Sequence, residues 1–271
     1  MSAAPAAASI AREWQRFTPR QRLTRYAFYL FAVAALMQSL RSVEIIPEFL
    51  EDMPEQVADL FTRMWPIDWN YYPTTVHAAL VETLHIATLG TILSLALAFP
   101  VGIMAARNIV RWPAVQLFAK FILVSSRSVN SLVWALLFVA VFGPGALAGT
   151  LAIAFRSIGF VGKLLGEALE EAHRGPVEAL TAAGAPPASV FLKAYWPQVQ
   201  PSFWSIALFR LDINIRESAV LGLVGAGGIG TALDDALSLL YWDQVAMTLL
   251  TIFAVVIVAE IAVTYIRSRI L

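Results

Sequence analysis

The chain alternates between long apolar stretches and short polar or charged segments. Several stretches are apolar over about the length that a helix needs to cross a bilayer, which is about 20 residues. They run approximately over Leu23–Leu40, Ala78–Ala106, Ala114–Phe142, Ala146–Val161, Val199–Val224 and Val245–Ile266. The pattern therefore predicts an all-α polytopic membrane protein with about six transmembrane helices.

The first apolar stretch follows a cluster of basic residues. An apolar stretch behind a basic region is also typical of a signal peptide. This stretch is long for a signal core, and it ends in Gln38, Ser39 and Arg41 without a small-x-small cleavage pattern. We therefore interpret it as an uncleaved first span with a cytoplasmic N-terminus. The cluster comprises Arg12, Arg16, Arg20, Arg22 and Arg25.

The segment Val43–Thr75 differs from the rest of the chain because it is acidic and interrupted by prolines. Its apolar residues recur at helical spacing, and its aromatic residues are placed like an interfacial belt. The aromatic residues are Trp65, Trp69, Tyr71 and Tyr72. We expect an extracytoplasmic segment that lies along the membrane surface. Residues 1–75 thus form an N-terminal part with a tail, one span and this segment, and residues 76–271 form the main transmembrane domain.

Short basic ends predict the direction of the spans. Basic residues favour the cytoplasmic side of a membrane protein. With about six alternating crossings, the basic residues at the span ends all fall on the same side of the membrane as the N-terminal arginines. Both termini are therefore expected in the cytoplasm, and the chain in the cytoplasmic (inner) membrane. These basic residues are Arg107, Arg111, Lys163, Arg174, Lys193, Arg267 and Arg269.

Composition agrees with a membrane protein and excludes several kinds of chemistry. Hydrophobic residues make up 59% of the chain and charged residues 14%, against about 25% charged in soluble proteins. Cysteine is absent, which excludes disulfides and thiolate metal sites. His77, His85 and His173 are too scattered for a metal site, and no G-x-x-x-x-G-K-[ST] motif is present. We see no nucleophile with a base and no basic aromatic surface for nucleic acid, so the chain is not expected to be an enzyme or to bind a cofactor.

A polar island between two spans predicts a helix-turn-helix. Ala179–Ala183 favours a helix, Gly184 suits a left-handed helix end, and Pro186 and Pro187 stop one helix and suit the start of the next. The island lies within about residues 165–197. Its spacing resembles the "EAA" coupling loop of binding-protein-dependent ABC importer permeases. Glu178, Ala179, Gly184 and Pro197 match that pattern, whereas Leu180, Ala194 and Trp196 depart from it.

The resemblance implies that Glu178–Pro187, including Ala185, docks into a groove of a cytoplasmic ATPase. The alternative is an ordinary amphipathic connector between spans. Because the chain has no ATP-binding motif, ATP and Mg²⁺ would be bound by the partner ATPase.

A glycine-rich stretch matches G-x-G-x-x-G, with glycines at Gly225, Gly227, Gly228 and Gly230. A dinucleotide site needs a strand before this motif and a helix after it. Here an apolar span precedes it, so we expect a close backbone turn covered by protein or facing a pore.

Two further runs make the resemblance more specific. The runs Leu165–Glu170 leading into Gly175–Glu178, and Arg210–Arg216 with Leu221–Val224 before the glycine-rich stretch, resemble the phosphonate permease subgroup. Permeases for phosphite and hypophosphite belong to the same subgroup. The resemblance covers about residues 75–268.

Ionisable residues occur inside the predicted spans, where charges usually face a bundle interior or an aqueous path. Asp212 and Arg216 have i, i+4 spacing and are expected to pair. Arg210, Asn214 and Glu217 share a neighbouring stripe of the same helix. We predict a substrate pathway for an oxyanion along this ribbon, with structural pairing between spans as the alternative. The predicted pathway residues are Arg127, Asn130, Arg210, Asn214, Arg216 and Glu217; Arg156 and Glu260 receive no role.

The resemblance implies a complete importer. It would contain a second copy of the permease, two ATPase subunits and an extracytoplasmic binding protein, all around a membrane domain of the type I importer permease fold. Two alternatives remain. One is a methionine or other amino-acid permease of the same architecture, and the other is an ion-coupled secondary transporter, which would carry an inverted repeat that is not visible in this sequence.

Overall fold

The computed structural model describes residues 17–43 and 47–270 of the chain, and within these residues it contains helices and no β-strand. The chain divides into two compact units, Met1–Ala58 and Asp59–Leu271. Arg12 and Arg16 of the basic cluster, and Glu44 of the acidic segment, lie outside the described residues.

The first unit contains helix α1, Pro19–Ser42, of which no residue is buried. Thr18 and Gln21 begin it with a capping box, in which each side chain bonds the other residue's backbone N–H. Helix α2, Pro47–Arg63, continues through Pro54 and crosses the boundary between the units. Its exposed apolar side chains include Phe49, Met53 and Phe61.

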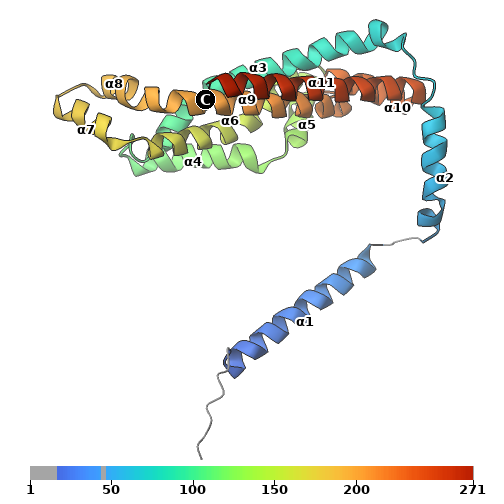
Figure 1. The fold of residues 1–271 in the computed structure, drawn as a ribbon, viewed down its shortest axis with the longest axis horizontal. Coiled ribbons are helices and arrows are strands. Elements are labelled where there is room, and N and C mark those ends of the chain that lie inside the picture. The colour runs from blue at the N-terminus through green and yellow to red at the C-terminus, as the bar shows by residue number, and fades with distance from the viewer. Residues whose placement is uncertain (1–16, 44–46, 271) are drawn as a thin grey trace, which may run out of the picture. The chain divides into compact units, whose positions relative to one another are not determined.

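The second unit is a bundle of antiparallel helices (Figure 1). After the π-helical turn η1, Tyr72–Val76, its long helices are α3, His77–Ala105; α4, Pro113–Ser128; α6, Ala146–Glu171; α9, Trp196–Leu221; and α11, Trp242–Ile270. With α1 included, five helical stretches of the described residues are long and apolar enough to cross a membrane. The number rises to six when the bent pair Pro113–Ser128 and Ser131–Phe142 is counted as a single span. The predicted number of spans is therefore confirmed.

The two ends of the bundle carry different short elements (Figure 1). At one end lie α7, Arg174–Ala182; α8, Pro187–Val190; and the π-helical turn η2, Phe191–Tyr195. We call it the coupling end. At the opposite end lie the 3₁₀ turn η3, Gly222–Val224, the glycine-rich stretch and α10, Ile229–Ser238. We call it the turn end.

The third predicted span is bent rather than straight. The sequence predicts one helix over Ala114–Phe142, whereas the structure has α4 and then α5, Ser131–Phe142, at 92° to it. Asn130 causes the break, because its side chain caps α5 by accepting a hydrogen bond from the Leu132 backbone N–H at 3.1 Å. The bent pair still joins the two ends of the bundle, since Arg107 before α4 contacts Glu170 near the coupling end and Gly145 after α5 contacts Gly225 near the turn end.

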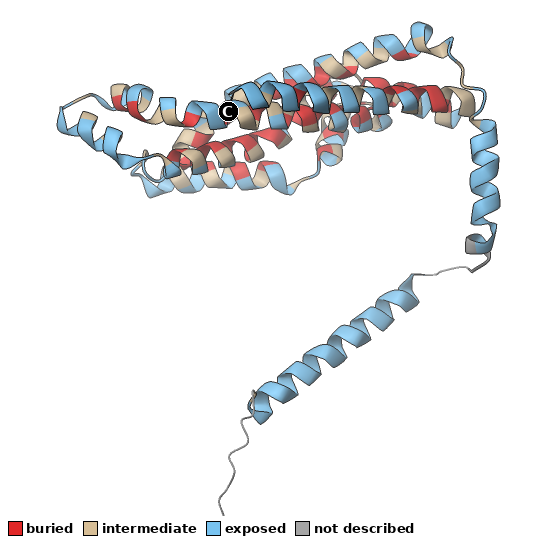
Figure 2. Ribbon diagram, viewed as in Figure 1, coloured by how far each residue is buried: buried red, intermediate tan, exposed pale blue. Residues whose placement is uncertain are grey.

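Small residues let the central helix α6 approach its neighbours closely. A Cβ at Gly159 would overlap the Leu123 carbonyl oxygen of α4, and one at Gly162 would lie 2.5 Å from Leu123 Cδ2. Small residues at such contacts are typical of membrane helix pairs. The buried residues accordingly gather in the interior of the bundle (Figure 2).

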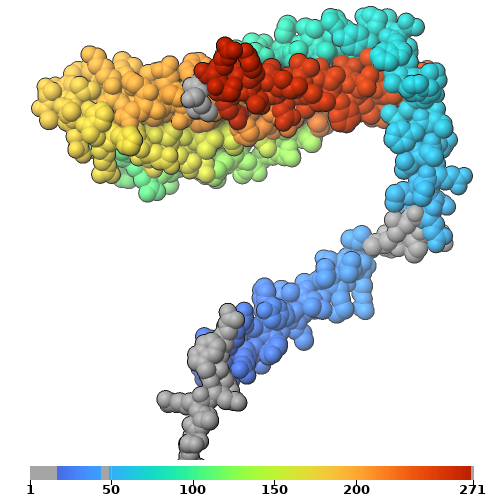
Figure 3. All heavy atoms as spheres, viewed as in Figure 1, coloured from blue at the N-terminus to red at the C-terminus, as the bar shows by residue number. Residues whose placement is uncertain are grey.

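The outer surface of the bundle is apolar. Figure 3 shows α11 as a ridge along the visible face, and its exposed side chains include Phe253, Ile257, Val258 and Ile261. Such a surface is suited to contact with lipid or with another apolar helix.

Candidate functional site

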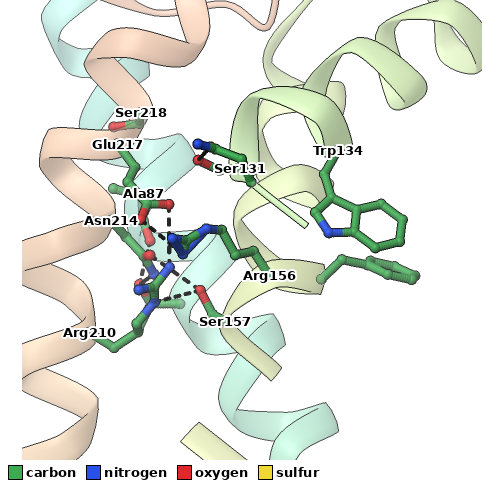
Figure 4. A network of polar contacts seen from close by, with 12 residues as sticks. Ala87, Ser131, Trp134, Arg156, Ser157, Arg210, Asn214, Glu217 and Ser218 are labelled. Carbon is green, nitrogen blue, oxygen red and sulfur yellow. Dashed lines mark hydrogen bonds and ion pairs between the residues drawn. The ribbon is translucent and has the colours of Figure 1, made fainter. Parts of the chain in front are cut away.

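A charged network connects α6 and α9 inside the bundle (Figure 4). Arg210 of α9 places Nη2 3.3 Å from Glu217 Oε2, and Arg156 of α6 places Nη1 3.3 Å from Glu217 Oε1. Arg210 and Glu217 lie two turns apart on one face of α9, so their long side chains can meet along that face. One carboxylate is thus shared by two guanidinium groups.

Neutral side chains extend this network to α3. Arg210 Nε donates to Ser157 Oγ at 2.8 Å, and Ser157 Oγ donates to Asn214 Oδ1 at 3.2 Å. Asn214 Nδ2 in turn donates to Thr91 Oγ1 at 2.7 Å. Buried polar groups in a membrane domain need such partners, because water and lipid provide none there. The chain of bonds holds α3, α6 and α9 together.

The network is closed on one side and partly open on the other. The Arg210 side chain is 3% exposed, whereas those of Arg156 and Glu217 are 30% and 18% exposed. Arg156 Nε is buried without a hydrogen-bond partner among the described residues. Because arginine stays protonated in proteins, two guanidinium groups and one carboxylate leave one positive charge in excess. Arg156 is the more exposed of the two arginines.

The other predicted pathway residues do not join this network. Arg216 pairs with Asp212, as the i, i+4 spacing predicts, and its side chain is 46% exposed. Arg127 is exposed at the end of α4 and lines a different cavity, and Asn130 caps α5. Of the six predicted pathway residues, the structure therefore brings together Arg210, Asn214 and Glu217.

Arg156 is the charged member of the network to which the sequence analysis gave no role. A charge in the middle of an apolar span marks it as unusual. Its partner Glu217 lies on another helix, however, and no spacing rule within one helix connects them. Ser126 of α4 bonds the same stretch of α6: its Oγ donates to the Phe155 carbonyl and accepts from the Gly159 backbone N–H at 2.9 Å.

The coupling end has the predicted helix-turn-helix. Glu178 and Ala179 lie on α7, of which no residue is buried. Gly184 ends the turn with φ +75°, and the Ala185 N–H bonds the Leu180 carbonyl at 3.0 Å. Pro186 and Pro187 begin α8, whereas Pro197 lies beyond η2 in the first turn of α9. The helix-turn-helix therefore projects from the coupling end, and α7 is not buried by the other described residues of the bundle.

The glycine-rich stretch is a close turn. Gly225, Gly227 and Gly228 have positive φ angles of +80°, +80° and +78°. Gly230 lies against Gly222, and a Cβ there would overlap the Ala219 carbonyl. Since the described residues hold no strand before it, the motif is not a dinucleotide-binding turn.

These features together define a class of protein. A bundle of apolar helices with a charged network inside and an exposed helix-turn-helix at one end is the architecture of a multi-pass membrane permease. The family model described as "Binding-protein-dependent transport system inner membrane component" matches residues 98–271, and the chain belongs to this family.

Two curated relatives are named as transport permeases. The phosphite transport system permease protein PtxC of Stutzerimonas stutzeri is 40% identical over 204 residues, which cover 75% of this chain and 74% of that protein. The phosphate-import permease protein PhnE of Mycolicibacterium smegmatis is 37% identical over 237 residues, covering 88% of this chain. The present chain spans 44% of that longer protein.

Solved structures share the fold. The inward-facing MetNI methionine ABC transporter matches with a TM-score of 0.63 at 21% sequence identity, covering 72% of this chain and 96% of that one. The bundle therefore has the fold of type I ABC importer permeases.

Proposed function

We propose that the chain is the transmembrane permease subunit of an ATP-driven importer that carries a phosphorus oxyanion, phosphonate or the related phosphite or hypophosphite, across the cytoplasmic membrane. The family membership and the names of the two curated relatives support this substrate class. The substrate itself would be selected mainly by an extracytoplasmic binding protein.

The observation that carries the oxyanion proposal is the unequal charge of the network. Glu217 supplies one negative charge for two arginines, and Arg156 is the more exposed of the two. Guanidinium groups bind phosphate-type oxygens through planar, charge-assisted hydrogen bonds. A passing oxyanion would compensate Arg156 while Glu217 stays with Arg210. Arg210 and Asn214 then hold the network in position.

The partners follow from the same proposal. Two copies of the chain would enclose the pathway around a two-fold axis, the commonest closed assembly. Two ATPase subunits, which hold ATP and Mg²⁺, would grip α7 and α8, and both termini would face the cytoplasm. The exposure of α7 and the sharp turn at Gly184 support a docking role for this element.

The amino-acid permease is the second candidate. The likeness to the MetNI methionine transporter favours the fold and, at 21% identity, carries no substrate. A neutral amino acid also gives no reason for an excess positive charge in the membrane. The ion-coupled secondary transporter is disfavoured by the family to which the chain belongs.

Reconstituted transport tests the proposal. The chain would be co-expressed with its proposed ATPase and binding protein and placed in liposomes, and uptake of phosphite, methylphosphonate and methionine would be measured with and without ATP. We expect ATP-dependent uptake of an oxyanion and none of methionine. Arg156→Gln should reduce oxyanion uptake at least tenfold with the complex intact, a factor that corresponds to about 1.4 kcal/mol.

Arg269→Gln is the matched control, because Arg269 is exposed near the end of α11 and bonds Tyr265 of its own helix. Uphill uptake by the permease without the ATPase would overturn the ATP-driven mechanism. Uptake of methionine, or unchanged oxyanion uptake by Arg156→Gln, would overturn the oxyanion assignment.

A further inference from the structure

A second charged site lies at the coupling end, apart from the network of Arg156, Arg210 and Glu217. It is a cavity of about 330 Å³ between the end of α3, α4 and α6. This volume falls within the range of about 300–1,000 Å³ found for ligand pockets. Leu123, Val124 and Gly166 form apolar parts of its wall. Its charged lining residues are Arg107, Lys120, Arg127, Lys163, Glu167 and Glu170.

The charges in this cavity do not balance. Lys163 is paired with Glu167, with Nζ 3.3 Å from Oε1. Glu170 Oε1 accepts a bond from the Arg107 backbone N–H at 2.8 Å rather than from a cationic side chain. Within the described part of the chain, Arg107, Lys120 and Arg127 have no carboxylate partner within the 4.0 Å limit for an ion pair. Four cations against two carboxylates leave two positive charges in excess.

Lys120 is the most informative of these residues. It is half-buried on α4, about 10 Å along the helix from Pro113 at a rise of about 1.5 Å per residue. Its side chain forms no hydrogen bond or ion pair with another described residue. A cation within a membrane domain is costly unless it is paired or hydrated. An anion in the cavity would supply the missing counter-charge.

The neighbouring walls define the kind of anion. Arg107, Lys120 and Lys163 come from three different chain segments and line the same cavity, while Leu123 and Val124 give it an apolar wall. Several cationic donors around one volume suit an anion with several oxygen atoms. Basic pockets between membrane helices are also typical sites for anionic lipid headgroups.

We propose that this cavity binds a phosphate-type oxyanion group. The group has two sources with the same chemistry, the headgroup of an anionic phospholipid and a free phosphate-type ion. The proposal goes beyond the transport function, and it does not depend on the identity of the imported substrate.

Binding to the full-length permease in neutral lipid tests the proposal. The protein would be placed in phosphatidylcholine nanodiscs, and two probes would be added separately: inorganic phosphate in solution, or phosphatidylglycerol in the disc. Native mass spectrometry counts the bound molecules, and thermal unfolding measures the affinity. We expect saturable binding of at least one probe, weakened about tenfold or more by Lys120→Gln and largely retained by Lys120→Arg.

Arg269→Gln serves as the control for a loss of charge elsewhere, and it should leave binding unchanged. Arg127→Gln, at an exposed position on the rim, gives an independent reading should Lys120→Gln fail to fold. Binding of phosphate assigns the free ion, and binding of phosphatidylglycerol alone assigns the lipid headgroup. The proposal is overturned when neither probe binds, or when binding is the same in wild type, Lys120→Gln and Arg127→Gln.

This result is independent of the transport function, because neither the ATPase nor uptake enters the measurement. A permease that carries oxyanions but binds neither probe would retain the first proposal and reject this one. A permease that binds a probe but imports no oxyanion would do the reverse.

Discussion

Arg156 of α6 lies 3.3 Å from Glu217 of α9, and among the residues that the structure describes this is the single ion pair that joins two different helices. The remaining pairs connect residues four or seven positions apart on one helix. Glu217 also pairs with Arg210, so both arginines of the network share one carboxylate.

Replacing this carboxylate should destabilise the bundle. Glu217→Gln leaves Arg156 and Arg210 facing each other without a counter-charge. Breaking a fully buried pair costs about 3 kcal/mol, and the partial exposure of Arg156 and Glu217 lowers this cost. Thermal unfolding of the purified permease in detergent measures the change. We expect a clearly lower midpoint for Glu217→Gln and partial recovery in the double variant Arg156→Gln/Glu217→Gln, which removes one of the two unpaired charges.

Glu260→Gln is the control for this experiment, because Glu260 is exposed on α11 and has no ion-pair partner among the described residues. An equal loss of stability in Glu217→Gln and Glu260→Gln would contradict a special role for the shared carboxylate.

The contact between α4 and α6 should not tolerate a methyl group. In Gly159→Ala the new Cβ would overlap the Leu123 carbonyl oxygen and lie 3.0 Å from the Arg127 backbone nitrogen. Because both neighbours are backbone atoms, the helices must separate, and overpacking of this kind costs about 2 kcal/mol. Unfolding of Gly175→Ala provides the comparison, since a Cβ there has no heavy atom within 4 Å. Equal stability of the two variants would show that α4 moves freely.

Gln198 should be needed for coupling rather than for folding. Its side chain accepts a bond from the His173 backbone N–H at 2.9 Å and donates to the Ala194 carbonyl at 2.6 Å. It thereby ties the residue before α7 to the first turn of α9, through bonds worth about 1 kcal/mol each. In Gln198→Ala we expect severalfold less substrate imported per ATP hydrolysed, with the ATPase still bound.

Gln200→Ala is the matched variant, because Gln200 is exposed two residues further along the same helix. If transport and ATP hydrolysis keep the same ratio in Gln198→Ala as in Gln200→Ala, the tie between α7 and α9 does not transmit movement.

The parts of the fold that depend on local sequence could be predicted. Apolar length gives the spans, and the Gly184-Ala185-Pro186-Pro187 run gives the end of one helix and the start of the next. The Asp212 and Arg216 pair follows from spacing on one helix and is confirmed. The roles of the coupling element and of the pathway residues stay predictions.

The features that arise between helices could not be predicted. The partner of Arg156 is on another helix, and the cavity around Lys120 forms where three chain segments meet. The bend at Asn130 could not be predicted for a different reason. The sequence from Ser131 to Phe142 is apolar throughout, and hydropathy indicates that a segment lies in the membrane but not the direction in which its helix runs.

The bend between α4 and α5 also decides how crossings are counted. With 12 residues, α5 is about 18 Å long, shorter than the roughly 30 Å hydrocarbon layer, yet α4 and α5 together carry the chain from one end of the bundle to the other. The bundle therefore makes an odd number of passages between its two ends. The sidedness of the two chain termini consequently rests on α1: with this helix threaded through the bilayer they share a compartment, and with it lying flat they do not.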